Sequence, residues 1–144
     1  EYQAGGHSKF DIKYHFVWVT KYRYKIFDNG IGQRLKILLI QTCQSRGITI
    51  ISGHVEDVAR DHVHILVSCP PSLSPAKIAQ YLKGRSSKIL QNEYPQLRKR
   101  YWGQHLWARG YFCATAGTIT DEMIKNYIEN HDDMDNNFTV EGDI

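Results

Sequence analysis

The sequence predicts an α+β fold in which a four-stranded antiparallel sheet carries its helices on one face. Strand-like runs and helical patterns alternate in the order β-α-β-β-α-β. Two of these strands are separated by only a short turn, as in a hairpin. The 144 residues are 42% hydrophobic and 12% aromatic, which is enough for one packed core. This order is typical of ferredoxin-like and RRM-like sheets, and here one more helix follows it.

The first half of the chain supplies a strand, a helix and a second strand. Residues 1–8 are polar and contain glycine, so we expect a loose lead-in. Residues 10–20 are rich in aromatic and β-branched side chains and predict a central strand. Apolar residues at helical spacing between Gly30 and Gly47 predict a helix that ends at the second glycine. Residues 48–56 predict the next strand.

The hairpin and the second helix follow. A turn around residues 58–60 leads into the strand 61–68, whose apolar run is bounded by Asp61 and by two prolines. Ser74 is a favoured N-cap and Pro75 suits the first helical position. We therefore expect a helix from Pro75 to about Tyr94.

The last part of the chain supplies the fourth strand and the extra helix. Residues 111–116 predict a short strand, and helical spacing of apolar residues continues after it as far as His131. We expect a single domain over residues 1–132. The acidic, Asn-rich segment 133–144 is predicted to be a mobile tail.

The composition excludes several classes of protein. No apolar stretch approaches the roughly 18 residues of a membrane span and no signal-peptide pattern is present, so we expect a cytoplasmic protein without a membrane partner. Cys43, Cys69 and Cys113 are widely spaced, which indicates reduced thiols and excludes a zinc-finger framework. No Gly-rich phosphate loop is present, so no nucleotide cofactor is expected.

Charge is distributed unevenly along a chain whose net charge is +3. Between residues 77 and 109 there are eight basic residues against the single acidic Glu93, whereas acidic residues dominate from Ile119 onward. A concentrated basic segment predicts a polyanionic partner, although a solvated helix surface has the same composition. The stretch Lys21-Tyr22-Arg23-Tyr24-Lys25 interleaves basic and aromatic side chains. It suits nucleic acid or simply an exposed strand end.

His62 and His64 stand two positions apart in the second strand of the hairpin. Side chains alternate between the faces of a strand, so both imidazoles point one way while Val63 and Ile65 point into the core. Two imidazoles about 7 Å apart on one sheet face are able to bind one cation. A structural role for each histidine is the alternative, and this alternative applies also to His15 in the first strand.

The last helix brings a second chemical group. Tyr127 and His131 are four residues apart and therefore share a helix face. A tyrosine phenol has a pKa near 10, so it needs a cation or a base beside it to act as a nucleophile near neutral pH. Alone, Tyr127 fits a half-buried ring and His131 a cation at a helix end. Together with His62 and His64 they suggest three imidazoles around a metal beside a nucleophilic phenol.

Four stretches resemble the single-tyrosine HUH transposases of prokaryotic insertion sequences. His62-Val63-His64, followed by Ile65-Leu66-Val67, is similar to the His-hydrophobic-His motif of HUH nucleases. The other three stretches run from Lys13 to Arg23, from Lys83 to Leu90, and from Tyr127 to Asn130. A lone His-x-His is weak evidence, whereas four motifs in this order over residues 10 to 131 are specific.

The resemblance implies a transposase that cuts and rejoins single-stranded DNA beside hairpins at the ends of an insertion sequence. It implies that Tyr127 is the nucleophile, leaving a 5′-phosphotyrosine and a free 3′-OH, and that His62 and His64 hold Mg²⁺ or Mn²⁺. The family's third ligand, four residues after the tyrosine, is commonly Gln, and here it is His131. Imidazole is a softer ligand than an amide oxygen, so we expect Mn²⁺ to gain on Mg²⁺.

The resemblance also implies a homodimer in which the tyrosine helix of one chain completes the histidine pair of the other. Gly110 and Gly117, which flank the last strand, are candidate hinges for that helix. We expect the DNA contacts to come from basic and hydroxyl side chains near the motifs. These are Lys83, Arg85, Ser86, Ser87, Lys88, Lys21 and Arg23.

Three other functions stay open. A different HUH endonuclease, such as a replication nickase or a domesticated nuclease that cuts repeat hairpins, would cleave without strand transfer. A non-catalytic nucleic-acid-binding module would tolerate loss of the Tyr127 hydroxyl. A small metal-dependent hydrolase unrelated to DNA would not bind single strands at low salt.

Overall fold

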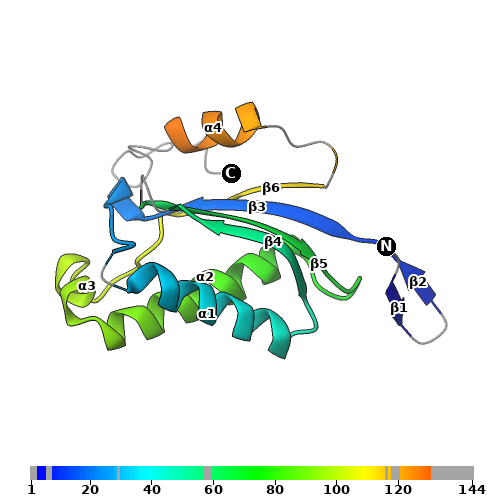
Figure 1. Ribbon diagram of the computed structural model, residues 1–144, viewed down its shortest axis with the longest axis horizontal. Helices are drawn as coiled ribbons and strands as arrows, with labels where there is room; N and C mark the ends of the chain where they lie inside the picture. Colours follow the sequence, from blue (N-terminus) through cyan, green and yellow to red (C-terminus); the bar gives the residue numbers. More distant parts are fainter. Residues whose placement is uncertain are drawn as a thin grey trace.

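The predicted α+β fold and its four-stranded antiparallel sheet are confirmed. The computed structural model describes residues 3–5, 8–28, 30–56, 60–115, 117 and 121–130. The strand order is β4-β5-β3-β6 (Figure 1). Its strands are β3 (Lys13–Val19), β4 (Thr49–Val55), β5 (His62–Ser68) and β6 (Phe112–Thr115). β3, predicted as a central strand, is central, and its neighbour at the centre of the sheet is the histidine strand β5.

The two faces of the sheet are covered differently. The helices α1 (Ile31–Ser45) and α2 (Pro75–Glu93) pack against one face, and α4 (Asp121–Glu129) lies over the other (Figure 1). The main core lies on the side of α1 and α2, where Trp18 and Ile65 from the sheet meet Leu38 and Leu82 from the helices. Burying each such side chain contributes about 1.5–3 kcal/mol.

Local signals position the two long helices. The Ser74 hydroxyl accepts a hydrogen bond from the backbone N–H of Lys77 at 3.1 Å, so the predicted N-cap is confirmed. Gly30 precedes α1 with φ 87°, a conformation that glycine adopts without steric cost. Arg85 of α2 donates to the Leu38 carbonyl at 3.2 Å and to the Thr42 hydroxyl at 3.0 Å, which ties the two helices together.

Two segments differ from the prediction. Residues expected to be a loose lead-in form a hairpin of β1 (Gln3–Gly5) and β2 (Ser8–Phe10), which backbone pairing holds without any apolar alternation. The helix α3 (Pro95–Arg100) was not predicted, because Leu97 is its only buried residue and one apolar anchor produces no periodicity. A 3-10 turn, η1 (Lys21–Arg23), follows β3.

Other predictions concern residues that the structure does not describe. His131, residues 58 and 59 of the predicted turn 58–60, and the tail 133–144 lie outside the described residues. Within the described residues, every helix is too short or too polar to cross a bilayer.

Candidate active site

The predicted alternation along β5 is confirmed. Val63 and Ile65 are 1% and 2% exposed in the core under α1 and α2. His62 and His64 point to the opposite face, which α4 covers, and line a cleft of about 400 Å³ there. The other lining residues are His54, Glu56, Arg23, Ile124, Lys125, Ile128 and Glu129.

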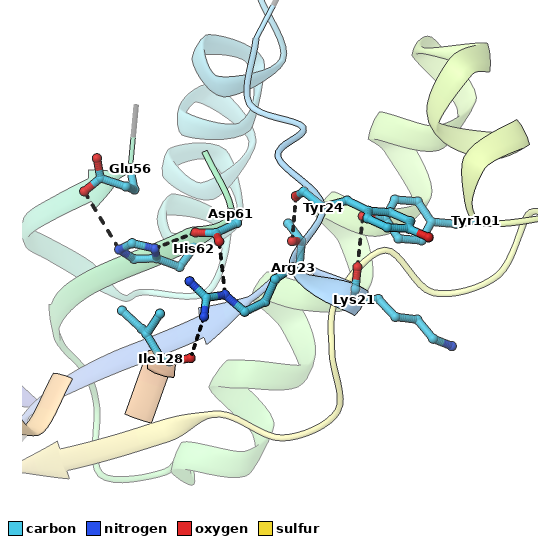
Figure 2. A network of polar contacts seen from close by, with 9 residues as sticks. Lys21, Arg23, Tyr24, Glu56, Asp61, His62, Tyr101 and Ile128 are labelled. Atoms are coloured by element: carbon cyan, nitrogen blue, oxygen red, sulfur yellow. Dashed lines mark hydrogen bonds and ion pairs between the residues drawn. The ribbon is translucent and has the colours of Figure 1, made fainter. Parts of the chain in front are cut away.

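The orientation of His62 is fixed by the residue before it. His62 Nδ1 lies 2.9 Å from Asp61 Oδ1, and His62 Nε2 is turned toward Glu56 Oε2 at 3.9 Å (Figure 2). Burial alone would raise the pKa of Asp61, but the hydrogen bond with His62 and the positive charge of Arg23 outweigh it and hold that pKa below its ordinary value. A carboxylate on Nδ1 selects the tautomer whose Nε2 carries the lone pair.

His64 contacts a third histidine. His64 Nε2 lies 3.1 Å from Nδ1 of His15 on β3, which shares the same face of the sheet. Burial lowers the pKa of His15, so its ring is neutral at pH 7 and one of the two imidazoles donates to the other. Binding a cation through Nε2 would require His64 to turn away from His15.

Arg23 joins the histidine strand to the C-terminal end of α4. Its Nε donates to Asp61 Oδ2 at 3.1 Å and its Nη1 donates to the Ile128 carbonyl at 3.1 Å (Figure 2). Asp61 is only 3% exposed, so water has little access to the carboxylate of this ion pair. One carboxylate therefore positions both an imidazole and the arginine that holds the last helix.

Tyr127 lies on the same side of the sheet as the histidines, over the edge strand β6. Its half-buried ring packs on Phe112 of β6, with ring centroids 5.7 Å apart. In the sheet register Val17 of β3 stands opposite Phe112 on one side and opposite His64 on the other. Adjacent strands are about 4.8 Å apart, so the Phe112 and His64 backbones are separated by about 10 Å.

The donors in the cleft suit a divalent ion in part. His62 presents an oriented Nε2 beside the Glu56 carboxylate, and imidazole with carboxylate is a usual donor set for Mn²⁺ and similar ions. Among the described residues no three His, Cys, Asp or Glu side chains are gathered as a metal cluster. The predicted third ligand, His131, lies outside the described residues.

Comparison with known proteins identifies the family. The family described as "Transposase IS200 like" matches residues 8–131 of this chain. The chain belongs to the IS200-like transposases. Their ISDra2 transposase TnpA from Deinococcus radiodurans is 30% identical over 94% of this chain and 94% of its own length. The transposase for insertion sequence element IS200 from Salmonella typhimurium is 31% identical over 85% of this chain and 78% of its own length.

Solved structures agree with the fold of this IS200-like transposase. A crystal structure of a candidate transposase from Deinococcus radiodurans R1 has a TM-score of 0.81 at 28% identity, over 90% of this chain and 97% of that one. A REP-associated tyrosine transposase bound to a REP hairpin has a TM-score of 0.53 at 12% identity, over 89% of this chain and 68% of that one. The second likeness concerns the fold alone.

The basic side chains predicted to contact DNA in this IS200-like transposase fall into two groups. Lys83 donates to the carbonyls of Ala108 and Gly110 at 2.9 and 2.6 Å, and Arg85 donates to the Leu38 carbonyl of α1. Both cationic side chains therefore make hydrogen bonds within the protein. Lys21 and Lys88 line a cleft of about 950 Å³ between α2 and the segment after α3, and Lys83 lies along the same cleft, whereas Arg85 does not. Arg23 belongs to the Asp61 network described above.

The two serines in this IS200-like transposase are bonded within the protein. Ser86 is 1% exposed, donates to the Leu82 carbonyl at 2.6 Å and accepts from the Trp107 indole at 2.9 Å. The Ser87 hydroxyl accepts from the Leu106 backbone N–H at 3.1 Å. Ser87 also lines the large cleft, whereas Ser86 lies beneath it.

Replacing Ser86 with alanine in this transposase is expected to lower stability without weakening DNA binding. The Trp107 indole N–H would lose its acceptor in a buried position, which costs about 1–3 kcal/mol. The measurements are urea denaturation and the affinity for single-stranded DNA, with Ser72→Ala, at an exposed position, as the matched control. A large loss of affinity at unchanged stability would show that the hydroxyl contacts DNA.

Sequence reasoning missed two acidic residues of the site. Asp61 directly precedes His62, so adjacency to a histidine strand was the signal that would have found it. Glu56 reaches the site only because β4 pairs with β5, where Val55 stands opposite Val63. The hairpin itself was predicted, but its register was not, and the register decides which residue of β4 lies beside His62.

Replacing Asp61 with asparagine in this IS200-like transposase is expected to lower the free energy of unfolding at pH 7 by about 1–3 kcal/mol. Because the pKa of Asp61 is lowered in the folded chain, the ionised carboxylate stabilises the fold at pH values above the ordinary carboxyl pKa. That contribution is lost as the pH falls through the folded-state pKa. Denaturation of both proteins at pH 7 and pH 3 measures the difference, which should shrink at pH 3. An equal difference at both pH values would contradict the charge argument.

Proposed function

We propose that this chain cuts and rejoins single-stranded DNA at insertion-sequence ends through a covalent tyrosine intermediate. The observation that supports this most is the convergence on one sheet face of the His62 and His64 imidazoles and the helix that carries Tyr127. Membership of the IS200-like transposases adds the reaction class.

The proposed chemistry is a pair of phosphoryl transfers. Tyr127 Oη loses its proton and attacks the phosphorus, an O–P bond forms, and the P–O3′ bond breaks to leave a 5′-phosphotyrosine and a 3′-OH. In the reverse sense a free 3′-OH attacks the phosphotyrosine and the tyrosine recovers its proton. Each step exchanges one phosphodiester for another, so no nucleotide is consumed.

His62 and His64 would hold the divalent ion, Mg²⁺ or Mn²⁺, with His131 as the third ligand. When bound, such an ion neutralises charge on the scissile phosphate. Asp61 would keep the His62 ring oriented. His64 would give up its hydrogen bond with neutral His15 in order to bind the ion. Changing His131 to Gln is expected to move the metal preference toward Mg²⁺, because an amide oxygen is a harder ligand than an imidazole.

We propose a DNA hairpin as the partner, held along the cleft that Lys21 and Lys88 line. Arg98 and Arg109 line the same cleft, and no acidic side chain is among its lining residues in the described chain. A cleft lined by several basic side chains and by no acidic one is suited to binding a phosphate backbone. The hairpin-bound REP-associated transposase, which shares the fold, is consistent with this partner.

A homodimer would let the phenol of one chain meet the imidazoles of the other. Within one chain the Tyr127 ring packs on Phe112, across β3 from His64. Gly110 and Gly117 have φ of 79° and 95°, conformations that favour glycine at both ends of β6. A helix that pivots there would present its tyrosine to the histidine pair of a second chain.

The test is a denaturing gel after incubation with labelled single-stranded DNA from the flanks of the protein's own gene. With Mn²⁺ we expect a protein–DNA adduct that survives denaturation, and exchange of strands when a second cleaved end is supplied. Cleavage without strand exchange would favour a nickase-like HUH endonuclease. Absence of both cleavage and adduct would overturn the proposal.

A further inference from the structure

We infer that the cleft between residues 21–24 and the end of α3 binds an unpaired nucleotide of single-stranded DNA by stacking its base. The inference rests on the proposed function and assigns it a subsite away from the histidine pair. The cleft has a volume of about 520 Å³. Its aromatic lining consists of Tyr22, Tyr24, Tyr101 and Trp102.

The rings around this cleft run from the core to the surface: Tyr101 is 3% exposed, whereas Tyr22 is 39% exposed. Tyr24 packs on Tyr22 and on Tyr101 with centroid separations of 5.4 and 5.5 Å, and Figure 2 shows the rings of Tyr24 and Tyr101 side by side. Trp102 is 86% exposed, whereas the chain's other two tryptophans, Trp18 and Trp107, are 0% and 4% exposed. A large ring held in water at the rim of a cleft is a feature of binding sites.

The backbone holds both rim residues in a conformation that is unusual for side chains of this size. Tyr22 has φ 62° and Trp102 has φ 57°. Left-handed backbone at bulky residues costs on the order of 1 kcal/mol or more and persists only where the surroundings fix it. Here the Gly103 N–H donates to the Arg98 carbonyl at 2.7 Å and the Arg23 N–H donates to the Thr20 carbonyl at 3.0 Å. Two strained turns from distant parts of the chain thus present two rings to one cleft.

The positive side chains around this cleft favour a partner that carries phosphate groups. The Arg100 guanidinium lies 4.0 Å from the Tyr24 ring centroid, and Lys21 Nζ lies 5.5 Å from that of Tyr22. No acidic side chain lines this cleft among the described residues. Lys21 and Gln104 also line the large basic cleft, so the two clefts adjoin at these residues. A strand whose phosphates follow Lys88 and Lys21 would bring its next base to the rings.

The magnitude of base stacking at this cleft is measurable. Stacking of one base on an aromatic side chain changes affinity by about 5- to 150-fold on alanine substitution. It releases no counterions, so it leaves the salt dependence of binding unchanged. A side chain that neutralises a phosphate behaves in the opposite way, because its removal lowers the slope of log K against log salt by about 0.7 for each phosphate involved.

The experiment titrates the full chain with an oligothymidylate that forms no hairpin and follows tryptophan fluorescence. Trp102 is the one exposed tryptophan of three, so base stacking is expected to quench the long-wavelength emission. Trp102→Ala is expected to weaken binding by about 5- to 150-fold with an unchanged salt slope, and Trp102→Tyr to restore most of the affinity. Lys88→Gln is expected to lower the slope. The matched control is Ile40→Ala, since Ile40 is 46% exposed on α1 and does not line the cleft.

Two outcomes would overturn the inference. One is wild-type affinity in Trp102→Ala together with unquenched emission in the wild-type protein. The other is a change of emission with protein concentration in the absence of DNA, which would make this surface an interface between copies of the chain. Failure of the adduct assay on wild-type protein, with quenching intact, would reject the proposed cleavage chemistry but leave the stacking site standing.

Discussion

Replacing Tyr127 with phenylalanine is expected to abolish covalent attachment to DNA and strand cleavage while leaving the fold intact. The substitution removes only the oxygen that we propose as the nucleophile, and the ring keeps its packing on Phe112 at 5.7 Å. Ile128, which is 8% exposed, continues to anchor the helix on the sheet. Removing the nucleophile from an enzyme that uses covalent catalysis lowers the rate by at least about 10⁴-fold.

The measurement is adduct formation on a denaturing gel, together with thermal unfolding to confirm the fold. Tyr81→Phe is the matched control, because Tyr81 is a half-buried tyrosine on α2 that packs against the Arg46 guanidinium at 3.8 Å. That variant should form adduct normally. Adduct in the Tyr127 variant at a tenth or more of the wild-type level, an order-of-magnitude threshold, would assign the nucleophile to another residue.

An equal mixture of Tyr127→Phe and His64→Ala chains is expected to regain roughly a quarter of wild-type activity, although each protein alone is inactive. Random exchange of subunits makes half of the dimers mixed. In a mixed dimer the intact tyrosine helix of one chain meets the intact histidine pair of the other at one of two sites. Within one chain the Tyr127 ring packs on Phe112, which lies across β3 from His64, and this is the reason to expect exchange of helices.

The reciprocal control uses a chain that carries both substitutions, mixed with wild type. If helices are exchanged between chains, each mixed dimer has one site without a phenol and one without the imidazole, so both sites are dead. If each helix serves its own chain, the wild-type half of every mixed dimer stays active. Wild-type homodimers leave roughly a quarter of the activity in the second mixture if helices are exchanged, and roughly half remains if each helix serves its own chain. Failure of the first mixture to recover, together with about half of the activity in the second, would show that the site is built within one chain.

Periodicity and capping made most of the fold predictable. Strong alternation around Val63 and Ile65 located β5 and the facing of its histidines, and Ser74 with Pro75 marked the start of α2. These signals lie within a few residues of each other and reflect local sterics. The tyrosine helix was predicted in the same way, and its described part ends at Glu129.

Long-range polar contacts were not predictable. Arg23 and Asp61 are 38 residues apart, and Lys83 bonds backbone carbonyls 25 and 27 residues away. Every residue carries a backbone carbonyl, so the sequence does not show which carbonyls will accept hydrogen bonds from side chains. It therefore does not distinguish a basic side chain that will bond a carbonyl from one that will stay in water. The functions of Lys83 and Arg85 in tying segments together therefore emerged only from the fold. The sequence around Trp102 likewise did not indicate that its side chain would be exposed to solvent.

The attachment of α4 has a consequence for hydrogen exchange. In the described chain, Ile128 is the only residue of this helix that is fully buried, and the Arg23 bond to its carbonyl holds the final turn. Burial of one isoleucine and one such bond are together worth about 2–5 kcal/mol, less than the stability of most domains. Amide protons of α4 should therefore exchange by local opening, well before those at the centre of β3 and β5.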